Sequence, residues 1–177
     1  MKNLFFLFTI TLLFSCSDSV EIPITENTSF IELEGTWNLT SLTSEYTTKV
    51  TSRVLSYDSK SNIHGEDYNF SFNFSQNSNK YTTKGAVKIV TKTKINDKVE
   101  TTNHNATAIQ GLSAGKWEVK GKELIFKNGN SNVIQSKFTV ESFSKNRMVL
   151  KQDLSENKVV DNDVIKTEGT ATIVLER

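Results

Sequence analysis

Hydrophobic and polar residues alternate along most of the chain from Gly35 onward, with the period of two that is typical of β-strands. The clearest example is an aromatic ladder on one face of a predicted strand. Its four members are Tyr68, Phe70, Phe72 and Phe74. Similar short runs follow one another, separated by turn residues such as Asn77-Ser78-Asn79 and Gly121-Lys122. The pattern predicts eight or nine antiparallel strands joined by tight turns, with no substantial helix after the N-terminal region.

An antiparallel meander has two free edges, and closing the sheet on itself removes them. We therefore expect an all-β fold, an up-and-down meander closed into a barrel, with an open sandwich as the alternative. A polar strand is expected from Val99 to about Ile109, and a last strand from about Val164 to Arg177. The segment from Asp58 to Asp67 is rich in Ser, Asn, His and Gly, which predicts a long loop.

One predicted strand carries four lysines on one face, with Val87, Ile89 and Ile95 on the other. The lysines are Lys84, Lys88, Lys92 and Lys94. They could meet phosphate-bearing lipids or an acidic partner. Because lysine commonly protects exposed strands, we interpret them as a solvated face.

A short apolar run, Leu4 to Phe14, precedes the β-rich region and ends at Ser15-Cys16. It falls below the roughly 20 apolar residues that span a bilayer, so residues 1–15 are predicted to be a removable signal peptide. Leu13-Phe14-Ser15-Cys16 resembles the bacterial lipobox. That resemblance implies an acylated, palmitate-type anchor on Cys16 and a place in the bacterial cell envelope, attached to the outer membrane on its periplasmic side or at the cell surface. A secretory signal followed by an incidental buried cysteine is the alternative.

Residues 16–29 are polar and acidic and lack periodicity, which predicts a flexible tether with a coil dimension of about 20 Å. Within it, Asp18-Ser19-Val20 resembles a short O-glycosylation motif of Bacteroidetes proteins. Residues 30–177 then form a single domain.

Composition narrows the possible partners. The chain has 21 basic and 20 acidic residues, and loss of the signal peptide removes only Lys2, which leaves 20 of each. This balance argues against nucleic acid, for which a basic excess is expected. Cys16 is the only cysteine, so no internal disulfide can form, and no thiol remains for catalysis once it is acylated.

The chain offers little catalytic chemistry. His64 and His104 have no cysteine or carboxylate at metal-ligand spacing. No Ser-His-Asp order, glycine-rich phosphate loop or HExxH helix is present. The carboxylate pairs Glu66-Asp67 and Asp161-Asp163 fall in predicted loops, where surface charge explains them. We expect a protein that is not an enzyme and that uses neither a metal nor a cofactor.

Two motifs resemble those of bacterial lipocalin-like lipoproteins of the Bacteroidetes type. Gly35-Thr36-Trp37 resembles the Gly-x-Trp motif that opens the first lipocalin strand, and the stretch from Gly115 to Phe126 resembles the middle of such proteins. The likeness covers roughly residues 33–177 and implies a lipocalin-like barrel. In that family the first tryptophan packs under a basic side chain, which implies Arg177 here, with Arg147 as the second choice. The chain lacks the Thr-Asp-Tyr loop, C-terminal helix and cysteine pair of classical lipocalins.

The resemblance implies binding of a small apolar or amphipathic ligand inside the barrel. The candidate lining residues are Tyr68, Phe70, Phe72, Phe74, Tyr81 and Trp117. The alternative is that these aromatic residues are simply the core, since an eight-stranded barrel can be filled by its own side chains. The protein would then be an interaction module that docks an envelope partner through its loops or outer face. An inhibitor or accessory subunit acting through residues 58–67 is a third possibility. In each case we expect a monomer.

Overall fold

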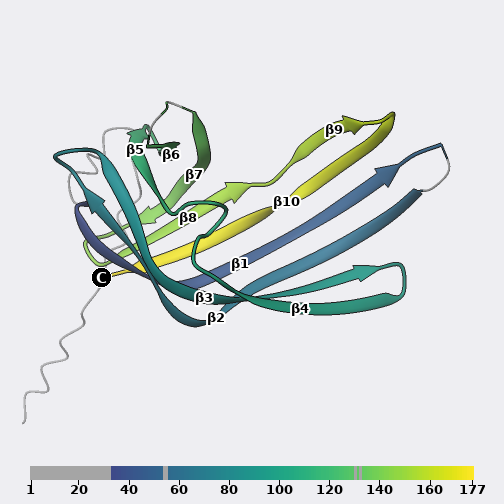
Figure 1. Cartoon of the computed structure of the whole chain (residues 1–177), viewed down its shortest axis with the longest axis horizontal. Coiled ribbons are helices and arrows are strands. Elements are labelled where there is room, and N and C mark those ends of the chain that lie inside the picture. The colour runs from purple at the N-terminus through teal and green to yellow at the C-terminus, as the bar shows by residue number, and fades with distance from the viewer. Residues whose placement is uncertain (1–32, 54–55, 130, 132) are drawn as a thin grey trace, which may run out of the picture.

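The computed structural model describes residues 33–53, 56–129, 131 and 133–177. The predicted signal peptide, Cys16 and the tether lie outside these residues. The described chain forms ten antiparallel strands, one more than the upper expectation (Figure 1). They are β1 (Gly35–Thr51), β2 (Ser56–Ser75), β3 (Lys80–Ile95), β4 (Lys98–Ala106), β5 (Ala114–Lys120), β6 (Glu123–Asn128), β7 (Ile134–Phe143), β8 (Arg147–Asp153), β9 (Glu156–Val160) and β10 (Asp163–Glu176). None of the described residues belongs to a helix long and apolar enough to cross a membrane.

Eight of the strands pair in a ring. The order is β1-β2-β3-β5-β6-β7-β8-β10, and β10 pairs with β1 to complete it. The antiparallel meander predicted from the sequence is confirmed. Two strands stand outside the ring: within the described chain, β4 pairs only with β3 and β9 only with β10.

The longest strands run beyond the ring. There β1, β2, β3 and β10 continue beside β4 and β9 as an open sheet in the order β9-β10-β1-β2-β3-β4, which we call the extension (Figure 1). The loop predicted from Asp58 to Asp67 is therefore wrong. Most of this segment lies in β2 between two paired neighbours, β1 and β3. Polar composition did not make it a loop because both neighbours offer backbone hydrogen bonds.

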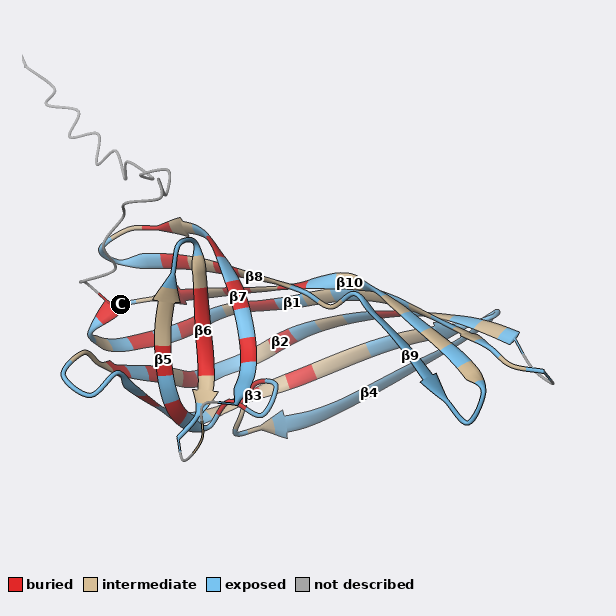
Figure 2. Cartoon of the chain, turned by 90° about the horizontal axis from the view of Figure 1, so that it is seen from above, coloured by how far each residue is buried: buried red, intermediate tan, exposed pale blue. Residues whose placement is uncertain are grey.

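The hydrophobic core lies in the ring. Buried residues, red in Figure 2, gather where β5 to β8 complete the ring, and they thin out along the extension. On the extension half-buried and exposed residues alternate, as in Ser44 to Val50 of β1. Such alternation is expected where no second layer covers the sheet. Ile95 illustrates the change: it was expected beside Val87 and Ile89, but it lies beyond the core and is 42% exposed.

Irregular pairing marks the passage from the ring to the extension. The β2–β3 register shifts between Glu66 and Asn69, and Asp67 has a positive φ of 51°. Opposite this β-bulge, Gly85 has a φ of 91°, and a Cβ there would lie 1.9 Å from the carbonyl oxygen of Asn69. Bulges bend a strand and increase its twist, so this pair of irregularities redirects β2 and β3 out of the ring.

Candidate functional site

The aromatic ladder is packed inside the ring. Phe70, Phe72 and Phe74 are each at most 3% exposed. The Phe72 and Phe74 rings stack with centroids 6.0 Å apart, and Phe74 meets Trp117 edge-on at 5.9 Å. Tyr81 packs edge-on against Phe126 at 4.8 Å. Such spacings leave the aromatic rings in mutual contact, so this part of the interior is filled by its own side chains.

Tyr68 differs from the rest of the ladder. It is 37% exposed, and its ring covers Gly65, where a Cβ would lie 2.6 Å from the tyrosine. Its hydroxyl accepts a hydrogen bond from the backbone N–H of Leu42 at 3.1 Å. This bond lies where the β1–β2 register shifts, between Asn38 and Thr43. The Tyr68 hydroxyl thus provides a hydrogen-bond acceptor for the Leu42 N–H where the pairing of β1 with β2 is irregular.

Trp37 is fully buried near the start of β1. The indole Nε1 of Trp37 donates a hydrogen bond to the carbonyl of Leu33 at 2.9 Å, and Leu33 is fully buried. The guanidinium of Arg177 lies 4.3 Å from the ring centroid of Trp37. The contact that the lipocalin resemblance implied is thus present and involves Arg177. Arg147 instead forms an exposed ion pair with Glu176 at 3.5 Å.

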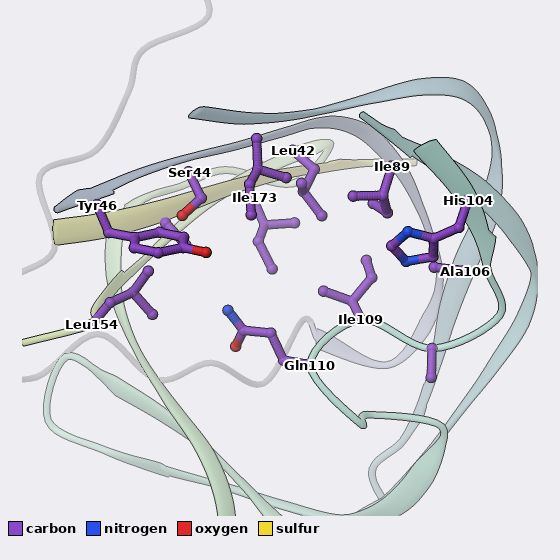
Figure 3. Close-up of a pocket in the computed structure, with 13 residues that line it drawn as sticks. Leu42, Ser44, Tyr46, Ile89, His104, Ala106, Ile109, Gln110, Leu154 and Ile173 are labelled. Carbon is purple, nitrogen blue, oxygen red and sulfur yellow. The ribbon is translucent and has the colours of Figure 1, made fainter. Parts of the chain in front are cut away.

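A cavity of about 280 Å³ lies between the aromatic core and the extension (Figure 3). Its walls come from β1, β2, β3, β4 and β10, from the connection between β4 and β5, and from Leu154 after β8. Most of its lining is aliphatic. The main apolar contributors are Leu42, Ile63, Ile89, Ile109, Ala171 and Ile173. None of the six aromatic residues predicted to bind a ligand lines this cavity.

A tight turn between β4 and β5 forms one wall of the cavity. Gln110 and Gly111 both have positive φ, 50° and 77°, and Leu112 N–H donates to the Ile109 carbonyl at 2.8 Å. This is the geometry of a type I′ turn. It inserts Ile109 and Leu112 into the core, where they are 4% and 0% exposed. The strand expected from Val99 to about Ile109 therefore ends earlier, at Ala106, before this turn. The turn could have been predicted from the Ile109-Gln110-Gly111-Leu112 sequence.

A few polar groups border this mainly apolar space. The hydroxyl of Ser44 is buried and has no hydrogen-bond partner among the described residues. Its side chain points toward the cavity, as do those of Tyr46, His104 and Gln110 (Figure 3). The Oε1 atom of Gln110 already accepts a hydrogen bond from Ser136 at 3.3 Å. An apolar chamber with a small number of polar groups suits binding of a small molecule.

The exposed charges lie elsewhere. Glu66 was expected in a loop, but it lies in β2. Its carboxylate is 2.8 Å from Lys88 Nζ and 3.3 Å from His64 Nε2. Hydrogen bonds from Lys88 and then His64 lower the pKa of the Glu66 carboxyl. The same bond to Glu66 raises the pKa of Lys88. In the part of the chain that the structure describes, no three His, Cys, Asp or Glu side chains gather where they could hold a metal ion.

Comparison with known proteins gives no match: no protein family, no curated protein and no solved structure is significantly similar to this chain.

Proposed function

We propose that this protein is a lipid-anchored envelope protein that binds a small apolar or amphipathic molecule. In this proposal the eight-stranded ring is a lipocalin-like barrel, closed at the Trp37 end. The ligand site is not the aromatic ladder but the cavity between that core and the extension. The protein would hold and present its ligand without chemical change.

The observation that carries this proposal is the apolar cavity together with the buried Ser44 hydroxyl, which has no hydrogen-bond partner among the described residues. Its volume of about 280 Å³ is near the lower end of the range for small-molecule sites, which is about 300–1,000 Å³. An apolar cavity of about 150 Å³ already holds benzene. A buried hydroxyl without a partner costs roughly 1–3 kcal/mol, so a ligand that supplies the missing hydrogen bond gains affinity. This favours an amphipathic ligand whose polar group reaches Ser44.

The proposed anchor rests on the sequence of the N-terminal region. Leu13-Phe14-Ser15-Cys16 has the small residue and the cysteine of a lipobox at the end of an apolar run. Removal of residues 1–15 and acylation of Cys16 would attach the domain to the outer membrane through the tether. Two or more acyl chains hold a protein stably on a membrane, whereas one binds only marginally.

Filling the cavity tests the proposed function. Ala171 is 5% exposed and lines the cavity, so the larger side chain in Ala171→Leu would occupy the ligand volume. Ala114 is exposed on β5, which makes Ala114→Leu the matched control. We expect solvent extraction and mass spectrometry to release a ligand from the purified wild-type protein and from Ala114→Leu, but not from Ala171→Leu. The fluorescent probe anilinonaphthalene sulfonate should likewise bind to the wild type and to Ala114→Leu, but not to Ala171→Leu.

Ala106→Leu, on another wall of the cavity, provides a second variant if Ala171→Leu does not fold. A wild-type protein that releases no ligand and binds no apolar probe would contradict the proposal. Equal binding by folded Ala171→Leu would show that the ligand occupies another site.

The second candidate is an interaction module that docks an envelope partner. The packed aromatic interior favours it, because a barrel filled by its own side chains needs no ligand. The same extraction separates the two candidates. An empty protein that resists apolar probes but crosslinks to a second protein in cells would favour the interaction module.

A further inference from the structure

We propose that two copies of this chain associate edge to edge through β4, forming one continuous sheet with a two-fold axis at Thr102. The monomer expected from the sequence would then be half of a dimer. The inference does not depend on what fills the cavity. It starts from the free edge that β4 leaves in the structure.

The outer edge of β4 is long and weakly protected. All nine residues from Lys98 to Ala106 pair with β3, and no other described strand pairs with β4 (Figure 2). Eight of the nine are exposed, and Ala106 is half-buried. Edge strands are usually guarded by proline, bulges or several lysines. This strand has no proline and a single lysine, at the hairpin end, and its centre is the uncharged sequence Thr101-Thr102-Asn103.

The hairpin fixes which backbone groups face outward. Asn96-Asp97 is a two-residue turn, so Ile95 and Lys98 form the closing pair that exchanges hydrogen bonds. The backbone N–H and C=O groups of alternate residues of β4 then point toward β3, and those of the other residues point away from it. The outward N–H and C=O groups belong to Val99, Thr101, Asn103 and Asn105. These backbone groups can form hydrogen bonds with a further strand at this edge.

One antiparallel register pairs all of these groups with a second copy. It places Thr102 opposite Thr102 of the partner, Thr101 opposite Asn103, and Val99 opposite Asn105. In the same register Glu100 faces His104 twice, once on each side of the axis. An imidazole N–H can donate to a carboxylate, so the two ends of the strand complement each other. If the partner strand shifts by two residues in one direction, Lys98 lies opposite His104 and the pairing with Glu100 is lost. If it shifts by four residues in that direction, the two Glu100 carboxylates lie opposite each other.

The other free edge suits a second copy less well. Strand β9 has five residues, compared with nine in β4. The hairpin pair Val160–Asp163 leaves only Asn157 and Val159 of β9 facing outward. Pairing through β9 would therefore form about half as many backbone hydrogen bonds. This difference selects β4 as the interface.

The interface would also reach the cavity. His104 and Ala106 line the cavity and lie on the same face of β4 as Glu100, since residues two apart on a strand share a face. In the dimer Glu100 of one copy would lie beside His104 at the cavity rim of the other. Each copy would thus contribute a carboxylate to the border of its partner's site.

A cysteine at the two-fold axis tests both the association and its register. Opposed residues of a non-hydrogen-bonded pair have Cα atoms about 4.5 Å apart, which permits a disulfide. We expect mild oxidation of the full-length Thr102→Cys protein to give disulfide-linked dimers. Thr91→Cys is the matched control, because Thr91 is paired with Thr102 one strand further from the edge. Its two copies would be about 14 Å apart, too far for a disulfide. Both variants and the wild-type chain retain Cys16, so the wild type measures linkage through that residue.

Mass in solution gives an independent reading. We expect sedimentation of the full chain in non-ionic detergent, at about 100 µM because an edge interface is small, to show twice the monomer mass. Thr101→Pro removes an outward N–H while leaving the pairing with β3, so it should restore the monomer mass with an unchanged circular dichroism spectrum. Glu100→His and His104→Glu should each weaken the dimer, and the double variant should recover it.

Several results would overturn the proposal. They are a monomer at this concentration, equal crosslinking of Thr102→Cys and Thr91→Cys, a dimer insensitive to Thr101→Pro, and larger assemblies that also use β9. None of these results bears on ligand release from the cavity, which tests the proposed function separately.

Discussion

The guanidinium carbon of Arg177 lies 4.3 Å from the centroid of the Trp37 ring, so the residue that follows β10 covers the indole of β1. Two hydrogen bonds fix this cation–π contact. Arg177 Nη2 donates to the Glu34 carbonyl at 2.7 Å, and Trp37 Nε1 donates to the Leu33 carbonyl at 2.9 Å. Both acceptors belong to the segment that leads into β1. The contact therefore links the C-terminal end of β10 to the segment that leads into β1.

Removing the Arg177 side chain should destabilise the protein. Arg177→Ala loses the cation–π contact and the hydrogen bonds to Glu34 and Lys145, which together stabilise the fold by about 1–3 kcal/mol. Urea denaturation should show this loss. The stability of Arg177→Lys should lie between those of the wild type and Arg177→Ala, because lysine keeps the charge but lacks the planar guanidinium. Arg147→Ala is the control, since its ion pair with Glu176 is exposed and contributes about 1 kcal/mol or less. Equal losses for the two alanine variants would mean that the contacts of Arg177 stabilise the fold no more than an exposed ion pair does.

Gly85 should not tolerate a side chain. Its φ of 91° is unfavourable for other residues, and a Cβ would lie 1.9 Å from the Asn69 carbonyl oxygen in the bulge. We expect Gly85→Ala to lower the free energy of unfolding by more than about 2 kcal/mol or to prevent folding. Gly121→Asn is the control, because Gly121 has a φ of 59° with no atom within 4 Å of the added Cβ. Asparagine tolerates a positive φ better than most residues with a side chain, and no atom opposes its Cβ, so this variant should lose less stability than Gly85→Ala. A stable Gly85→Ala would indicate that the bulge is free to shift.

Burial of Tyr81 should make the protein sensitive to alkali. Burial raises the pKa of the Tyr81 phenol to about 12, and the hydroxyl donates to Gln135 at 3.0 Å. The phenol ionises near pH 10 in the unfolded chain, so the folded state binds this proton more tightly. The resulting stability is complete below pH 10 and is lost as the pH rises from 10 to about 12.

Comparing variants isolates this effect from other groups that titrate at high pH. Between pH 9 and 12, the urea midpoint of Tyr81→Phe should fall less steeply than that of the wild type. Tyr57→Phe, on the extension, controls for loss of a phenol. Identical slopes for the wild type and Tyr81→Phe would show that the Tyr81 phenol ionises equally in the folded and unfolded states.

The sequence predicted the local features of the fold well, because they depend on neighbouring residues. Period-two alternation identified the antiparallel strands, and the Asn77-Ser78-Asn79 turn between β2 and β3 was found from its composition. The two-residue turn at Gly121-Lys122 joins β5 and β6, with Gly121 at positive φ as a type II′ turn requires. The contact between Trp37 and Arg177 came from the resemblance to lipocalins, not from periodicity.

The cavity could not be predicted in the same way. Its walls combine residues from five strands with the turn at Gln110, so no single segment carries its pattern. The aromatic ladder misdirected the site prediction, because Phe70, Phe72 and Phe74 alternate identically whether they face a ligand or one another. The length of β2 was missed for a related reason: pairing on both sides depends on which strands lie beside it.

Membrane attachment should depend on Cys16. Under the proposed anchor, Cys16→Ala removes the acylated thiol, and the protein should move from the membrane fraction to the soluble fraction of lysed cells. Metabolic labelling with an alkyne fatty acid should mark the wild type and not the variant. Ser19→Ala, in the same predicted tether, is the control and should remain with the membranes. A Cys16→Ala protein that stays membrane-bound would contradict the anchor while leaving the ligand proposal open to its own test.

Replacing Ser44 should raise stability and weaken ligand binding at the same time. The buried hydroxyl of Ser44 lacks a partner among the described residues, and removing such a group gains about 1 kcal/mol in the ligand-free protein. If the polar group of a ligand bonds to this hydroxyl, Ser44→Ala should also weaken binding by roughly five- to tenfold. Thermal denaturation without ligand and titration with the extracted ligand would measure the two effects. Ser71→Ala, on the outer side of β2, should change neither by a comparable amount. A variant that is less stable than the wild type yet binds normally would mean that the Ser44 hydroxyl stabilises the fold and does not contact the ligand.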